Sequence, residues 1–399
     1  MSPVLPFDII AIIIDIVLVG ENKDINLLKD LALVSCSFQQ ICSKHLFATV
    51  ELHDADPSCH LASSKKGFIK LLRSRPDVIR HIRKLTYNVD VNINNDDHQL
   101  SPTLLNFLPT NSRLNCLTII ARDWNTLNSS LTSAFFHLMH LPTVNHIEIS
   151  KVRNFPLSSL TLSVNLHRLD IFNVGYLWPL EEPTSYKIIM EKMPKIREFH
   201  TIDSSPLTMK LLHARMQDGR PAFNFKDLRR VSMSLCMFLD QRNMQYLLQN
   251  AKLLEKIDLS VSDARFLVGV LSLSPRTLKV LDLSVDLPTR NNVKLGGLCE
   301  ELEVLAGHDM LEALSFAFQV DGDETENFIG SIMQRMEKVL VKPGWFALKQ
   351  VSFRISIAPW GNSLKLCEAL QSLPDKYLSH LSKLESIAFK YSAYRTVAK

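Results

Sequence analysis

The chain has 399 residues, of which 46% are hydrophobic and 22% charged, a composition that excludes an intrinsically disordered protein. Only 12 residues are glycine, which argues against folds built on glycine-rich phosphate-binding loops. The net charge of +4 is unevenly distributed along the chain. Residues 1–50 hold three lysines and five acids, whereas residues 65–84 hold eight bases and one acid. The sequence therefore lacks the general basic character of a nucleic-acid-binding protein.

The first apolar run extends from Val4 to Val19 and has the length of a signal-peptide core. Two acids, Asp8 and Asp15, interrupt it, and no lysine or arginine precedes it. This pattern favours a buried amphipathic helix over a signal peptide or a membrane span. The seven cysteines are scattered and include no C-x-x-C pair, as expected for reduced thiols. We therefore expect a cytoplasmic or nuclear protein.

Three short helices are predicted before residue 50. The first begins at Leu5-Pro6, because proline is tolerated in a first turn, and ends at Gly20. Its apolar residues recur at helical spacing: Ile9, Ile10, Ile13, Ile16 and Val17. The second and third helices are indicated by the apolar sets Leu27, Leu28, Leu31 and Val34, and Phe38, Ile41 and Cys42, and an extended segment follows at 46–50.

These segments, taken in order, resemble the F-box of fungal-type F-box proteins, in which divergent leucine-rich repeats follow the box. The resemblance is carried by Leu5-Pro6 with Ile9 and Ile10, by Leu33-Val34-Ser35-Cys36-Ser37-Phe38 with Ile41, and by the exit His45-Leu46-Phe47-Ala48-Thr49-Val50-Glu51-Leu52. It implies an F-box-like helical domain at residues 1–52 that docks on the Skp-type adaptor of a cullin ubiquitin ligase. The implied adaptor-binding residues are Leu5, Pro6, Ile9, Ile10, Ile13, Leu33, Val34 and Phe38. Phe38 departs from the family, which often has tryptophan there. The alternative is that these side chains pack on the repeats that follow.

Residues 53–81 form a junction with one predicted helix, in which Phe68, Ile69, Leu71 and Leu72 are apolar and Arg75-Pro76 marks the end. The basic run at 65–84 has two interpretations. It is either a solvated face over the start of the repeats or a patch for phosphate, nucleic acid or an acidic partner. The absence of an interleaved aromatic set argues against single-stranded nucleic acid.

From residue 82 to 399 the pattern apolar-x-x-apolar-x-apolar recurs about every thirty residues. It is found at Ile82/Leu85/Tyr87, Leu114/Leu117/Ile119, Val144/Ile147/Ile149, Leu166/Leu169/Ile171, Ile196/Phe199, Leu228/Val231/Met233, Leu254/Ile257/Leu259, Leu278/Leu281/Leu283, Leu311/Leu314/Phe316, Leu348/Val351/Phe353 and Leu384/Ile387/Phe389. Helices are predicted between these motifs at 127–141, 185–193, 206–216, 243–248, 264–271, 325–339 and 363–373. A unit of this length cannot bury its own apolar face, so the units must stack.

The expected fold is therefore α/β, with a small helical F-box followed by an irregular leucine-rich-repeat-like solenoid that has a curved parallel sheet. The usual Asn or Cys ladder position is occupied once, by Cys236, and elsewhere by Asp286, Ser262, Ser356, Ser392, Gln319 or Val152. Serine and aspartate can bond the turn backbone and valine cannot, which predicts irregularity. Two doubly wound α/β domains are the alternative fold, and the low glycine content argues against it.

No catalytic, cofactor-binding or metal-binding motif is present. We therefore expect a protein that is not an enzyme and has no cofactor, no nucleic-acid partner and no membrane partner. The resemblance implies a substrate-recognition subunit that contacts the adaptor, the cullin ligase subunits and an unknown protein substrate. The competing function is a repeat scaffold for protein interaction with no ubiquitin-ligase role.

Overall fold

The computed structural model describes residues 7–17, 25–53, 65–89, 108, 113–175, 193–216, 218–287, 297–320, 326–358 and 363–396. Leu5 and Pro6, and most of the helix predicted at 185–193, lie outside them. The chain forms two compact units, Met1–Leu166 with Val174–Leu177 and His167–Asn173 with Trp178–Lys399.

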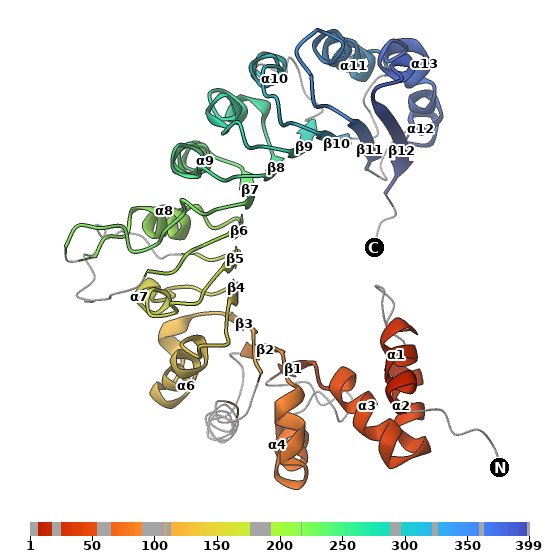
Figure 1. Ribbon diagram of the computed structural model, residues 1–399. Coiled ribbons are helices and arrows are strands. Elements are labelled where there is room, and N and C mark those ends of the chain that lie inside the picture. The colour runs from red at the N-terminus through yellow and green to blue at the C-terminus, as the bar shows by residue number, and fades with distance from the viewer. Residues whose placement is uncertain are drawn as a thin grey trace, which may run out of the picture. The chain divides into compact units, whose positions relative to one another are not determined.

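Twelve strands are present in the described part of the chain, and within each unit neighbouring strands pair in parallel and in chain order (Figure 1). The first unit has β1 (Thr49–His53), β2 (Lys84–Val89), β3 (Cys116–Ala121) and β4 (His146–Ser150). The second unit has β5 (Arg168–Phe172), β6 (Glu198–Ile202), β7 (Arg230–Leu235), β8 (Lys256–Val261), β9 (Val280–Leu287), β10 (Ala313–Val320), β11 (Gln350–Ile357) and β12 (Ala388–Arg395). The predicted α/β repeat fold with a parallel sheet is confirmed.

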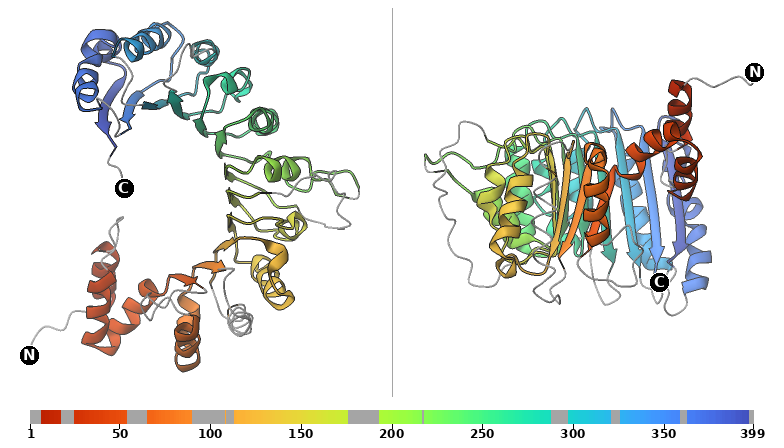
Figure 2. Two further views of the ribbon diagram at one scale, coloured as in Figure 1. Left: turned by 180° about the vertical axis from the view of Figure 1, so that it is seen from behind. Right: turned by 90° about the horizontal axis from the view of Figure 1, so that it is seen from below.

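Helices separate the strands. The first unit has α1 (Phe7–Val17), α2 (Ile25–Val34), α3 (Cys36–Leu46), α4 (Lys65–Ser74), η1 (Pro76–His81), η3 (Trp124–Thr126), α6 (Ser129–Met139) and α7 (Leu157–Thr161). The second has α8 (Ser205–His213), α9 (Phe238–Asn250), η4 (Ala264–Leu267), η5 (Leu271–Leu273), α10 (Leu298–Leu305), α11 (Glu326–Leu340), α12 (Ser363–Gln371), α13 (Leu373–Tyr377) and η6 (Leu381–Lys383). Within the second unit, the helices lie on one side of the strands (Figure 2). The helix predicted at 264–271 is two 3₁₀ segments, η4 and η5.

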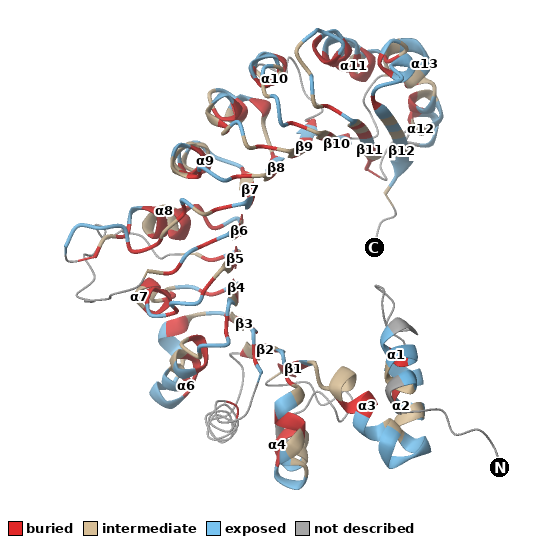
Figure 3. Cartoon of the chain, in the orientation of Figure 1, coloured by how far each residue is buried: buried red, intermediate tan, exposed pale blue. Residues whose placement is uncertain are grey.

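The core of the second unit is a set of apolar ladders between strands and helices. In β9 and β10 every second side chain is buried, and the parallel register places Leu314 opposite Leu281 and Val351. Phe316 and Phe353 stack with ring centroids 5.1 Å apart. Equivalent apolar positions thus repeat from strand to strand, as stacking of the units requires. Figure 3 shows the same segregation, with buried residues on the helix faces toward the strands.

Two details of the repeats differ from the predicted pattern. The final motif was expected at Leu384, Ile387 and Phe389, but Phe389 pairs with Val351 and Tyr391 pairs with Phe353. The register is therefore two residues later, because Leu384 caps the 3₁₀ turn η6 and is not the residue that leads into β12. The second detail is β1: the segment predicted to be extended at 46–50 becomes a strand of the sheet over Thr49–His53 by pairing with β2, and its last residue lies beyond the predicted F-box-like range 1–52.

Two of the serines at the ladder position make the expected bonds. The Ser262 hydroxyl donates to the Leu235 carbonyl at 3.3 Å, and the Ser356 hydroxyl donates to the Phe318 carbonyl at 3.3 Å. Val152 is fully buried and offers no such bond. Hydroxyls thus replace the Asn ladder in part.

Candidate functional site

The three N-terminal helices α1, α2 and α3 pack around a very small core. Its fully buried residues are Ile14, Leu28, Ile41 and Cys42. One residue, Ser35, separates α2 from α3, and its side chain caps α3 by accepting a hydrogen bond from the Phe38 N–H at 3.3 Å. A cap of this kind fixes the corner at which Leu33 and Val34 lie. Four buried residues make a marginal core, so these helices leave much apolar surface uncovered.

The uncovered apolar side chains lie on α1 and α2. Leu33 is 85% exposed and Val34 is 66% exposed at the carboxyl end of α2. On α1, Ile9, Ile12 and Ile13 recur at helical spacing on one exposed face. We name the exposed set the α1–α2 apolar surface: Ile9, Ile12, Ile13, Ile25, Leu27, Leu33 and Val34. Seven exposed aliphatic residues on two short helices are more than a small domain usually leaves uncovered, which is typical of a protein-docking region.

The predicted adaptor-binding residues divide into two groups. Ile9, Ile13, Leu33 and Val34 are exposed, whereas Ile10 and Phe38 are partly buried and pack against the core of the three helices. Leu5 and Pro6 lie outside the described residues. The sequence did not single out Ile12, Ile25 and Ile14, of which Ile14 is the buried residue of α1. Because α1 is apolar on nearly all sides, periodicity alone could not identify the face that packs.

Asp15 links α1 to α3. Its carboxylate lies 3.0 Å from Lys44 Nζ and 2.8 Å from His45 Nε2. The hydrogen bond from Lys44, together with His45, holds the pKa of Asp15 below its usual value. These two contacts join α1 to α3.

The sheet face of the second unit carries charges that largely satisfy one another. Lys256 Nζ lies 2.6 Å from Asp282, and Arg168 pairs with Asp170 and Glu198. Burial, with the like charge of Asp282, raises the pKa of Asp258, and burial lowers that of His200. Since the ion pairs are internally balanced, this face has no strong charge of one sign among the described residues.

A second apolar surface lies at the carboxyl ends of β6, β7 and β8. Phe238, at the start of α9, is 69% exposed, and its ring lies 5.2 Å from that of Phe266 in an edge-to-face contact. Ile202, Met237 and Val268 are also exposed, and in the sequence they lie at or shortly after the ends of these three strands. We name Ile202, Met237, Phe238, Phe266 and Val268 the strand-end apolar surface. Aromatic and methionine side chains of this kind are enriched where proteins bind one another.

None of the helices in the described ranges combines the length and the hydropathy needed to cross a bilayer.

Comparisons with known proteins leave the family open. No protein-family model matches the chain. No curated protein sequence matches it either. Among solved structures, an internalin from Listeria monocytogenes is similar at 10% sequence identity, with 84% of this chain and 89% of the internalin chain covered and a TM-score of 0.25. A TM-score this low supports no transfer of fold or function, so the repeat architecture rests on the strand order and register described above.

Proposed function

We propose that the chain is a substrate-recognition subunit of a cullin-type ubiquitin ligase that docks on a Skp-type adaptor through α1 and α2. The observation that supports this proposal is the α1–α2 apolar surface on a three-helix segment whose sequence resembles an F-box. Covering an exposed leucine or isoleucine contributes about 1.5–3 kcal/mol. Leu33 and Val34 alone therefore supply a substantial part of a micromolar affinity.

The chain acts by positioning and is not itself an enzyme. In a cullin-type ligase the activated ubiquitin is carried by other subunits, and the recognition subunit raises the target's effective concentration near it. Two binding surfaces on one chain meet that requirement. The first is the α1–α2 apolar surface, and the second is the strand-end apolar surface, where Phe238 and Phe266 would anchor the target protein.

Co-purification with a Skp-type adaptor tests the proposal. We expect the full chain to form a one-to-one complex with the adaptor, and a Leu33→Asp variant to lose it, because a carboxylate would have to be buried without a partner. Leu253→Asp is the matched control, since Leu253 is also an exposed leucine but lies in the second unit. Point variants are preferable to deletion of residues 1–52, which would remove most of β1 from its pairing with β2.

The alternative is a repeat scaffold with no ubiquitin-ligase role. Its support is the same parallel repeat fold, which suits protein binding without any adaptor. In that case the folded full chain fails to bind the adaptor, and Leu33→Asp changes a different set of partners or none. A Phe238→Ser variant separates the two surfaces. It should leave adaptor binding unchanged and remove target binding.

A further inference from the structure

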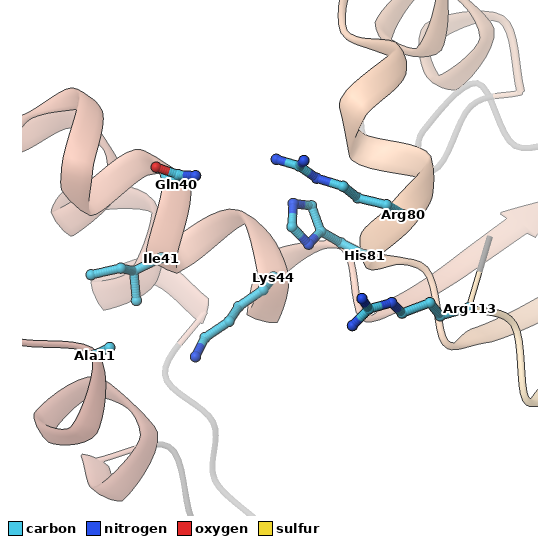
Figure 4. Close-up of a pocket in the computed structure, with 7 residues that line it drawn as sticks. All are labelled: Ala11, Gln40, Ile41, Lys44, Arg80, His81 and Arg113. Atoms are coloured by element: carbon cyan, nitrogen blue, oxygen red, sulfur yellow. The ribbon is translucent and has the colours of Figure 1, made fainter. Parts of the chain in front are cut away.

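A pocket of about 350 Å³ opens between the N-terminal helices and η1 (Figure 4). Its walls are Ala11 of α1, Gln40, Ile41 and Lys44 of α3, Arg80 and His81 of η1, and Arg113 ahead of β3. In Figure 4 the side chains of Arg80, His81 and Arg113 lie together on one wall, and the α1 and α3 residues face them. All these residues belong to the first unit. The pocket brings together bases that are up to 69 positions apart in the sequence.

Two carboxylates around this pocket, Asp15 and Asp77, are engaged by bases other than Arg80 and Arg113. Asp15 pairs with Lys44 and His45, and Asp77 accepts two 3.0 Å hydrogen bonds from Arg75. Among the described residues, neither Arg80 nor Arg113 forms an ion pair. The two guanidinium groups therefore keep their full donor capacity for an incoming anion.

We propose that this pocket binds the phosphate group of a small organic compound, with Arg80 and Arg113 as the charged donors. Guanidinium groups match the oxygens of a phosphate in a bidentate geometry. Gln40 adds a neutral donor, and Ala11 and Ile41 supply an apolar wall for the remainder of the ligand. A volume of about 350 Å³ exceeds what a bare phosphate fills and falls at the lower end of small-molecule sites, which are about 300–1,000 Å³.

The chemistry required is a phosphate monoester, which a soluble metabolite or a lipid headgroup can supply. The pocket also separates the basic residues of segment 65–84 into two groups. Arg80 and His81 line the pocket, whereas Lys70 and Arg73 lie exposed on α4 outside it. The site is independent of the adaptor proposal, because none of its residues belongs to the α1–α2 apolar surface.

His81 reports on the occupancy of the pocket. Burial, followed by Arg80, lowers the pKa of its imidazole, and Arg113 and Arg83 act in the same sense against Asp77. The other charged or titratable groups around it are Lys44 and Cys36 on α3, Arg75 before η1, and Asp15 on α1. A bound dianion offsets the arginine charges, so the imidazole pKa must rise when the site is filled.

Titration of the full chain with phenyl phosphate tests the proposal. We expect saturable one-to-one binding, and a loss of about tenfold or more in affinity for Arg80→Gln and for Arg113→Gln, as expected when a charge-assisted hydrogen bond is removed. Arg73→Gln removes the same charge from exposed α4 and should bind as the wild type does. Proton NMR should record a higher His81 pKa with phenyl phosphate than without it. Arg80 and Arg113 are exposed, so both variants should retain the wild-type melting temperature.

A parallel assay with vesicles identifies the source of the phosphate. Phosphatidylcholine vesicles with and without phosphatidic acid are sedimented with the protein. Binding that needs phosphatidic acid and is lost in Arg80→Gln, but not in Arg73→Gln, assigns the site to a lipid headgroup, and binding of phenyl phosphate alone assigns it to a soluble ligand. The proposal is overturned if neither probe binds, or if Arg73→Gln weakens binding as much as Arg80→Gln does.

Discussion

The Leu33→Ala substitution tests the docking surface quantitatively. Because Leu33 is 85% exposed, its truncation should leave the free energy of unfolding within about 0.5 kcal/mol of wild type. If the adaptor covers this side chain, the substitution removes about 2 kcal/mol of apolar burial from the complex. Since each 1.4 kcal/mol is a factor of ten, the dissociation constant should rise about 30-fold. Titration calorimetry with a purified Skp-type adaptor measures this change, and thermal melts measure the folding.

Two further substitutions serve as controls for the Leu33→Ala result. Leu253→Ala, at an exposed leucine of the second unit, should change neither quantity. Leu28→Ala, in the core of the three helices, should cost about 2–5 kcal/mol of their stability and weaken docking only through unfolding. If Leu33→Ala and Ile13→Ala both bind the adaptor as tightly as the wild type, the α1–α2 apolar surface is not the docking site.

Other predictions concern the second unit and are measured by chemical denaturation. Gly330→Ala in α11 should destabilise it by about 1–3 kcal/mol, since the new Cβ would lie 2.5 Å from the Tyr377 ring, and a Tyr377→Ala background should abolish that loss. Glu337→Ala should cost about 3 kcal/mol by leaving the His380 and Leu381 amides unpaired; Glu337→Gln, which keeps an acceptor, should cost less. Burial lowers the pKa of His200 below its unfolded value of about 6.5. The folded state is therefore most stable above about pH 6.5, where His200 is neutral in both states, and it loses stability as the pH falls from there toward the folded pKa. His200→Gln should reduce this loss by at most about 1.4 kcal/mol per pH unit, and an unchanged pH profile would contradict the reasoning.

Much of the repeat fold follows from local pattern. Strand side chains alternate between two faces, so the spacing Leu278, Leu281 and Leu283 predicts a strand with one buried face, and the structure places β9 there. The third helix was equally predictable, because its apolar residues Ile41 and Cys42 are both buried in the structure. The pattern predicted the wrong register for β12. Leu384 ends the 3₁₀ turn η6, and the strand register is two residues later than predicted.

The sequence by itself determined where most of the strands and many of the helices lie, because apolar periodicity follows from backbone geometry. Only the tertiary structure decided which apolar faces remain uncovered. In α1 both Ile13 and Ile14 are apolar neighbours, but α2 and α3 cover Ile14 alone. The pocket was likewise invisible in the sequence, since Arg80 and Arg113 become neighbours only when β2 pairs with β3. Exposure and convergence depend on what the other elements bury, and local pattern does not encode that.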